Sequence, residues 1–164
     1  MVGEIERVLA ALERAGVRYL VVGGVAVVLH GFLRTTADLD LVIQLDPANV
    51  RRALDALTDL DYQPRAPVPA ASFAEPAIRQ QWIREKNLRV FSLWTAGGFL
   101  EVDLFVEEPF DFEAVYARAV RVPLGEVEVW VVGRSDLIAL KRSAGRPLDL
   151  EDAERLEELG EDDG

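Results

Sequence analysis

The sequence has 164 residues, half of them hydrophobic, which suffices for one domain with a substantial core and leaves no room for a second catalytic module. The formal net charge of −11 argues against broad nucleic-acid binding through phosphate contacts. There is no cysteine and only one histidine, so disulfides, cysteine nucleophiles, thiolate metal sites and His-rich zinc sites are excluded.

The two ends of the chain carry further information. The first residues are acidic, whereas a signal peptide begins with basic residues, and no apolar run approaches the roughly 18 residues that a membrane span needs. The sequence therefore predicts a cytoplasmic protein. From Glu151 onward there are eight acidic residues and one arginine, so the acidity is concentrated at the C-terminal end. We expect one domain over residues 1–160, followed by an acidic tail at 161–164.

Hydrophobic periodicity predicts a mixed α/β domain, with a sheet of about five strands flanked by helices. Helices are expected at about 3–15, 25–32, 47–60, 111–119, 135–143 and 149–159. Strands are expected at 17–22, 38–43, 88–94, 99–106 and 127–132, the third and fourth of them forming a hairpin. Four prolines between Tyr62 and Pro76 predict a long, mobile loop without regular structure, which could close over a site as a lid.

Three acidic residues in the expected strands indicate a metal site. Asp38 and Asp40 lie two positions apart, so their side chains project from the same face of a strand, about 6.6 Å apart. Asp103 is a lone acid within another apolar strand. Hard oxygen ligands suit Mg²⁺ or Mn²⁺, and a pair of such ions would both neutralise the three carboxylates and assist phosphoryl or nucleotidyl transfer.

Gly23-Gly24 ends an expected strand and precedes an expected helix. Glycines allow the backbone to approach a ligand closely, and unpaired N–H groups that follow such a turn can bind phosphate. Each feature alone has a simpler interpretation: an ordinary turn for the glycines, and solvent-facing acids for the aspartates. Their occurrence together, in this order and spacing, favours a nucleotide site.

The order of these motifs resembles the DNA polymerase beta-like nucleotidyltransferase superfamily and, more closely, its small bacterial AbiEii-type members. The resemblance depends on Gly23-Gly24, Arg34-Thr35-Thr36, Asp38-Leu39-Asp40-Leu41, Asp103, and the C-terminal pattern Lys141, Arg146, Asp149 and Asp152. It implies the nucleotidyltransferase fold and an enzyme that uses two Mg²⁺ or Mn²⁺ ions to move NMP from an NTP such as ATP to a hydroxyl group.

The resemblance also implies roles for single residues. Asp38 and Asp40 would bind both metal ions, Asp103 would bind the ion that activates the acceptor, and Gly23 and Gly24 would bind the triphosphate. Lys141 would contribute a cation to the phosphates, the alternative being an ordinary solvated helix lysine.

Four further residues have mainly structural alternatives. Arg34 is expected either to touch phosphate or to pair with an acid. Arg146 and Asp149 are expected to form a pair at the start of a helix that begins at about Asp149. His30, in an apolar helix, is expected to pack rather than to act as a base.

The acceptor stays open. Relatives imply a tRNA 3′ end, a protein hydroxyl or an aminoglycoside-like small molecule, and toxin members of the group imply an antitoxin as a partner. RNA would dock at the local basic cluster formed by Arg79, Arg84, Lys86 and Arg89. The competing hypotheses are a catalytically silent nucleotide-binding or interaction module of the same fold and, with less support, a two-metal nuclease.

Overall fold

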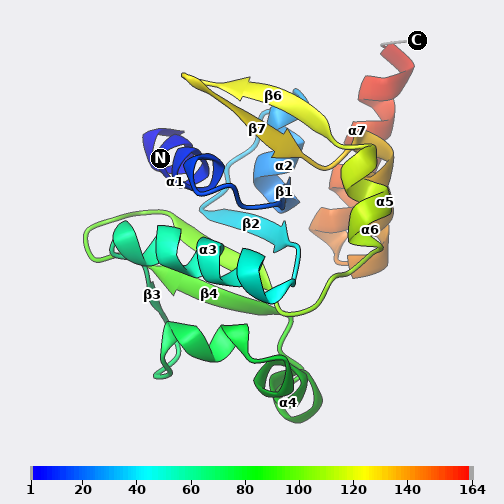
Figure 1. Ribbon diagram of the computed structural model, residues 1–164. Coiled ribbons are helices and arrows are strands. Elements are labelled where there is room, and N and C mark those ends of the chain that lie inside the picture. Colours follow the sequence, from blue (N-terminus) through cyan, green and yellow to red (C-terminus); the bar gives the residue numbers. More distant parts are fainter. Residues whose placement is uncertain (1, 163–164) are drawn as a thin grey trace.

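The computed structural model describes residues 2–162, and seven strands form one mixed sheet in the order β3-β4-β5-β2-β1-β7-β6 (Figure 1). The strands are β1 (Tyr19–Val22), β2 (Asp38–Ile43), β3 (Gln63–Pro64), β4 (Val90–Trp94), β5 (Glu101–Phe105), β6 (Val120–Leu124) and β7 (Val127–Val131). The helices are α1 (Val2–Arg14), α2 (Gly23–Leu29), α3 (Pro47–Asp59), α4 (Pro76–Lys86), α5 (Phe112–Ala117), α6 (Arg134–Ala144) and α7 (Pro147–Asp162), with a 3-10 helix at Ala70–Ala74. The predicted mixed α/β class is confirmed.

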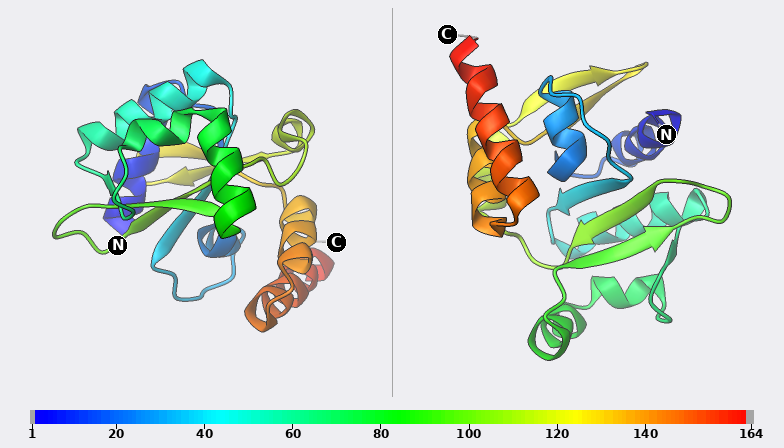
Figure 2. Two further views of the ribbon diagram at one scale, coloured as in Figure 1. Left: turned by 90° about the horizontal axis from the view of Figure 1, so that it is seen from below. Right: turned by 180° about the vertical axis from the view of Figure 1, so that it is seen from behind.

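The centre of the sheet is covered on both faces. β2 pairs parallel with β5 and antiparallel with β1, and β1 pairs parallel with β7. Helices α1 and α3 pack together over one face, whereas α2 and the α6–α7 pair lie on the other (Figure 2). All four residues of β1 are buried, as its continuous apolar sequence predicts. Over β4 and β5, the face that carries α2 has no helix in front of it among the described residues.

The sheet has two strands more than expected, and both lie at its edges. β3 contains Pro64 and β6 contains Pro123. Proline is tolerated on edge strands because one side of the strand needs no donor, but it removes the sequence signal of a strand. All seven strands belong to one sheet, which supports our proposal that residues 1–160 form one domain. Residues 161–162 of the expected tail continue α7, and 163–164 lie outside the described residues.

The segment 62–76 differs from the irregular loop that we expect from its prolines. It forms β3 and the 3-10 helix and then leads into α4. Phe73 is fully buried and stacks on Phe91 at 5.3 Å between ring centres, and Arg79 Nη1 donates a hydrogen bond to the carbonyl of Phe73 at 2.6 Å. These anchors oppose the expected lid. Because Arg79 is buried, it is also not available to the expected basic cluster.

The start of α7 also differs from the expectation. The helix begins at Pro147 rather than at Asp149, because the Asp149 side chain reaches back and accepts a hydrogen bond from the backbone N–H of Arg146 at 3.3 Å. Asp149 is therefore the third residue of the helix and satisfies a free donor at its start.

Among the described residues, no helix combines the length and apolar character that a membrane crossing requires.

A buried amide links β1, β2 and α3. Asn49 is fully buried at the start of α3; its Oδ1 accepts from the backbone N–H of Arg18 at 2.8 Å, and its Nδ2 donates to the carbonyls of Arg18 and Gln44 at 3.0 and 2.8 Å. Without this side chain the partly buried N–H of Arg18 and the carbonyl of Gln44 would lose a hydrogen bond, which is costly.

We predict that Asn49→Ala lowers the free energy of unfolding by about 2–4 kcal/mol, because three hydrogen bonds are lost and their backbone partners stay partly buried. Urea unfolding followed by circular dichroism measures this change. Arg51→Ala, on the exposed side of the same helix, serves as the control and should change stability by less than about 0.5 kcal/mol. Equal stability of the two variants would contradict the proposed link.

Candidate active site

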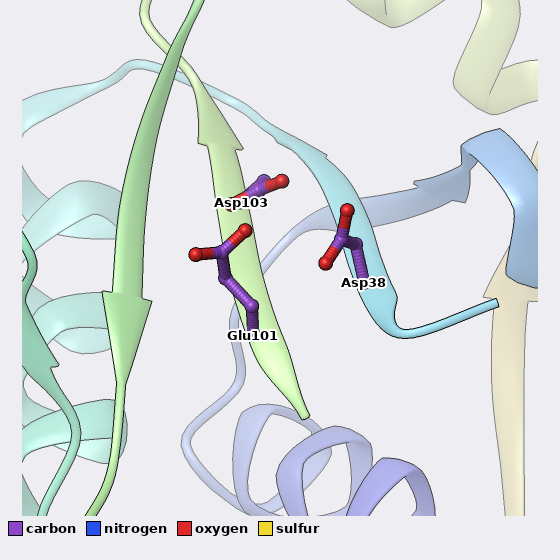
Figure 3. Close-up of side chains that lie close together, drawn as sticks. All are labelled: Asp38, Glu101 and Asp103. Atoms are coloured by element: carbon purple, nitrogen blue, oxygen red, sulfur yellow. The ribbon is translucent and has the colours of Figure 1, made fainter. Parts of the chain in front are cut away.

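The three acids singled out in the sequence come together on β2 and β5. The parallel register places Asp38 beside Glu101 and Asp40 beside Asp103. Paired residues of neighbouring strands project from the same face, so four carboxylates form a block on the face that carries α2. Figure 3 shows Asp38, Glu101 and Asp103 turned toward a common space, and one oxygen of each lies within 4.8 Å of the other two.

Glu101 is the member of this group that the sequence interpretation missed. It lies two positions before Asp103, which is the same spacing as that between Asp38 and Asp40. The second acid-x-acid pattern was therefore a usable signal. Glu101 also forms an ion pair with Arg65, from the segment that follows β3.

The carboxylates are held in surroundings that disfavour their charge. Burial, followed by the charge of Asp38, raises the pKa of Asp40 to about 6. Burial also raises the pKa of Asp103 to about 7, with a hydrogen bond from Ser92 opposing the shift and the neighbouring acids increasing it. Burial and the charge of Glu101 raise the pKa of Asp38.

One oxygen of this cluster has no partner. Asp103 is buried, and its Oδ1 accepts no hydrogen bond from any described residue. A buried acceptor without a partner is unfavourable, and a hard cation would satisfy it together with the neighbouring carboxylates. All four carboxylates offer oxygen ligands of the kind that Mg²⁺ or Mn²⁺ takes, and one oxygen each of Asp38, Glu101 and Asp103 already lies close enough to share an ion.

The glycine pair lies directly against these acids. Gly23 has φ +69°, and a Cβ there would lie 2.0 Å from Asp40 Oδ2, so both the backbone conformation and the space require glycine. A Cβ on Gly24 would lie 2.9 Å from Thr36 Oγ1 and 3.4 Å from Cζ of Arg34. The structure therefore brings Gly23 against Asp40 and Arg34 beside Gly24.

The remaining predicted residue, Lys141, is buried with Asp149 and Asp152 in an ionic network at the junction of α6 and α7. Its Nζ lies 3.4 Å from Asp149 Oδ1 and 3.0 Å from Asp152 Oδ2. Arg34 pairs with Asp152, and Arg146 Nε lies 2.7 Å from Asp149 Oδ2. Three cations thus share two carboxylates, which leaves an excess of positive charge in this network.

This network acts on the acidic cluster. The positive charges of Lys141 and Arg146 lower the pKa of Asp40 and partly offset its burial. Lys141 is therefore not a solvated helix lysine, and Arg34 pairs with an acid, one of its two expected roles. His30 lies with Nε2 at 2.8 Å from the carbonyl of Val132, which agrees with a packing role.

The site therefore has three parts on one face. Four carboxylates occupy its centre, the network of Arg34, Lys141 and Arg146 lies on the side of α2, α6 and α7, and Arg65 lies on the side of β3 and β4. Such an arrangement can hold divalent cations and a polyphosphate, because metal-binding carboxylates lie next to unneutralised positive charge.

Solved structures of similar fold include antibiotic-modifying nucleotidyltransferases. The lincosamide antibiotic adenylyltransferase LnuA, bound to lincomycin, superposes with a TM-score of 0.64 at 15% identity over 96% of each chain. The antibiotic-resistance factor ANT(2'')-Ia, in complex with adenylyl-2''-tobramycin, superposes with a TM-score of 0.59 at 14% identity over 94% of this chain and 86% of the other. At these identities the likeness shows the fold alone.

Sequence comparison gives the family. No curated protein matches the chain at a significant level, and the narrower resemblance to AbiEii-type proteins stays a prediction. A family model described as a nucleotidyltransferase of unknown function, DUF6036, matches residues 2–159, which include the acidic cluster, the glycine pair and the α6–α7 network. The chain therefore belongs to this family of nucleotidyltransferases.

Proposed function

We propose that this protein transfers a nucleoside monophosphate from an NTP, with ATP as the first candidate, to a hydroxyl group of a small molecule, and that the transfer depends on divalent metal ions. The observation that carries the proposal is the group of Asp38, Asp40 and Asp103, with an unpartnered buried oxygen on Asp103 and Gly23 directly against Asp40. Membership of a nucleotidyltransferase family supports it.

The residues of the site have separate tasks in this proposal. Asp38, Asp40 and Asp103 would hold the ions, which supply neutralisation of phosphate charge and a lower pKa of the acceptor hydroxyl. Gly23 and Gly24 would bind the triphosphate through their backbone, and the absence of their side chains leaves room for the side chains of Asp40 and Thr36. Lys141 lies where its charge reaches the same region, and Arg34 lies beside Gly24.

The transfer itself is a displacement at the α-phosphorus. The acceptor oxygen forms a bond to this phosphorus and loses its proton, the bond to the β-phosphate oxygen breaks, and pyrophosphate leaves. The chain's contribution is to orient the two substrates and to stabilise the charge that develops on the leaving group.

A small-molecule acceptor is favoured over RNA or a protein. The net charge of −11 and the burial of Arg79 disfavour an RNA surface at α4. The acidic cluster suits a positively charged acceptor. Two proteins of similar fold are described with lincomycin and adenylyl-2''-tobramycin bound, which supports this acceptor class. Neither a tRNA acceptor nor an antitoxin partner is proposed.

We predict that Mg²⁺ and NTP together stabilise the fold by about 2.7 kcal/mol when free NTP is a hundred times its Kd, because ligand binds the folded state only. Thermal unfolding with and without both ligands measures this effect as a rise in Tm. Asp40→Asn should abolish the rise, whereas Asp55→Asn, an exposed acid on α3, should keep it. Absence of any rise with all four NTPs and millimolar Mg²⁺ or Mn²⁺ would count against the proposed enzyme and favour a silent module.

We predict that Asp103→Asn lowers the rate of transfer at least a hundredfold, about 2.7 kcal/mol of transition-state stabilisation, and changes the Kd for NTP less than about fivefold. The reason is that Asp103 lies on the acceptor side of the cluster, away from Gly23, so it is needed mainly in the transition state. Calorimetric titration gives the Kd and pyrophosphate release gives the rate. Near-normal turnover in this variant would remove Asp103 from the site.

The raised pKa values predict how stability depends on pH. The carboxyls of Asp40 and Asp103 bind protons more tightly in the folded chain, with pKa values of about 6 and about 7, than in the unfolded chain, where the ordinary value is 3.8. At pH values between the unfolded and the folded pKa, the folded state binds more protons than the unfolded state. The free energy of unfolding of the metal-free protein should therefore fall as pH rises from 4 to 7.

Urea unfolding at several pH values checks this slope. Asp103→Asn should flatten it and raise stability near pH 7, because a buried charge is removed, and Asp55→Asn should leave it unchanged. If Asp103→Asn does not alter the slope, burial does not raise the pKa of Asp103.

A further inference from the structure

Arg65 lies against two side chains at the border of the acidic cluster. Its guanidinium carbon is 5.5 Å from the ring centre of Trp94, and the guanidinium forms an ion pair with Glu101. Its backbone N–H donates to the carbonyl of Ser92 at 3.0 Å, which fixes the start of the side chain beside β4. Both ends of the arrangement are open to solvent, since Trp94 is 43% exposed and the Arg65 side chain 56%.

Trp94 and Glu101 lie on the same face as the acidic cluster. β4 pairs antiparallel with β5, with Ser92 opposite Asp103 and Leu93 opposite Val102, and the next position places Trp94 opposite Glu101. Residues that lie opposite each other project to the same side of the sheet. The pair therefore borders the carboxylates on the side away from Gly23 and Lys141.

We propose that Trp94 and Glu101 form a subsite for a positively charged group of the acceptor, an ammonium or guanidinium, and that Arg65 occupies this subsite until the acceptor binds. This inference rests on the proposed function, because the acceptor must also bring a hydroxyl to Asp38, Asp40 and Asp103. Glu101 can take this task because it already pairs with a cation, the guanidinium of Arg65.

The chemistry of the subsite is that of cation recognition. An aromatic ring face attracts a cation, and a carboxylate accepts charge-assisted hydrogen bonds from it. Arg65 shows this directly, because its guanidinium uses both groups at once. An exposed ion pair contributes little to stability, so an acceptor cation can displace the Arg65 side chain at small cost.

The test uses simple cations, methylguanidinium and spermidine, so that it does not depend on knowing the acceptor. Arg65→Ala vacates the subsite and should bind spermidine at least fivefold more tightly than the wild type, measured by calorimetry and ligand-observed NMR. Addition of Trp94→Leu to Arg65→Ala should reverse the gain. A neutral sugar such as glucose should bind none of these proteins.

A matched control separates the subsite from a general increase in negative charge. Arg118 also pairs with an acid, Asp136, at 2.9 Å and with similar exposure of both side chains, but no aromatic ring of the described residues lies against its guanidinium. Arg118→Ala should therefore not strengthen spermidine binding. An equal gain in Arg118→Ala, or no gain in Arg65→Ala, would overturn the proposal, as would a gain that survives Trp94→Leu.

Titration of the wild type with NTP and Mg²⁺ distinguishes this inference from the proposed function. Loss of NTP binding in the wild type, with the cation result intact, would overturn the transferase and leave a cation site. Normal NTP binding without the cation result would leave the transferase and overturn the subsite.

Discussion

The parallel pairing of β2 with β5 is the constraint on which the site depends. Its register alone places Asp38 beside Glu101 and Asp40 beside Asp103. A slip of one residue would turn Asp103 toward the opposite face, into the packed layer beneath α1 and α3. Like charges side by side oppose the pairing, so the apolar face must fix the register. That face consists of fully buried side chains, Leu39 and Leu41 on β2 and Val102 and Leu104 on β5, whose packing fixes the register.

The resulting electrostatics explain why the site suits metal ions. The positive charges that reach Asp40, those of Lys141 and Arg146, are already paired with Asp149 and Asp152. They lower the pKa of Asp40 only in part, and burial still raises it to about 6. The fold thus holds acids that its own cations do not neutralise, and strongly perturbed pKa values of this kind are frequent at functional sites.

Sequence reasoning predicted those parts of the fold and site that depend on local pattern. β1 is apolar throughout, β2 and β5 are apolar apart from their acids, and the spacing of Asp38, Asp40 and Asp103 relative to Gly23 gives the order of the motifs. The elements that were missed carry weak or misleading local signals, such as the edge strands β3 and β6 with their prolines. Glu101 differs from these, because its spacing from Asp103 was visible in the sequence and was overlooked.

Other features arise only from tertiary contacts and have no local signal. Arg34 and Asp152 are 118 positions apart and meet only because α7 returns to the loop before β2. Arg79 has the sequence of a surface cation, but the carbonyl of Phe73 accepts its hydrogen bond in the interior. Only the structure shows that this charged residue is buried. The structure therefore also decides that α4 packs through Arg79 and does not present it in a basic surface.

The positions of the charged groups around the cluster also assign sides to the two substrates of the proposed reaction. The attacking and leaving oxygens of a displacement at phosphorus lie on opposite sides of it. Arg34, Lys141 and Arg146 lie on the side of α2 and α6, so the leaving pyrophosphate belongs there. The acceptor must then approach from β4. No helix of the described residues covers that side, which Trp94 and Glu101 border, so in the proposed reaction the acceptor's charge would lie at this pair.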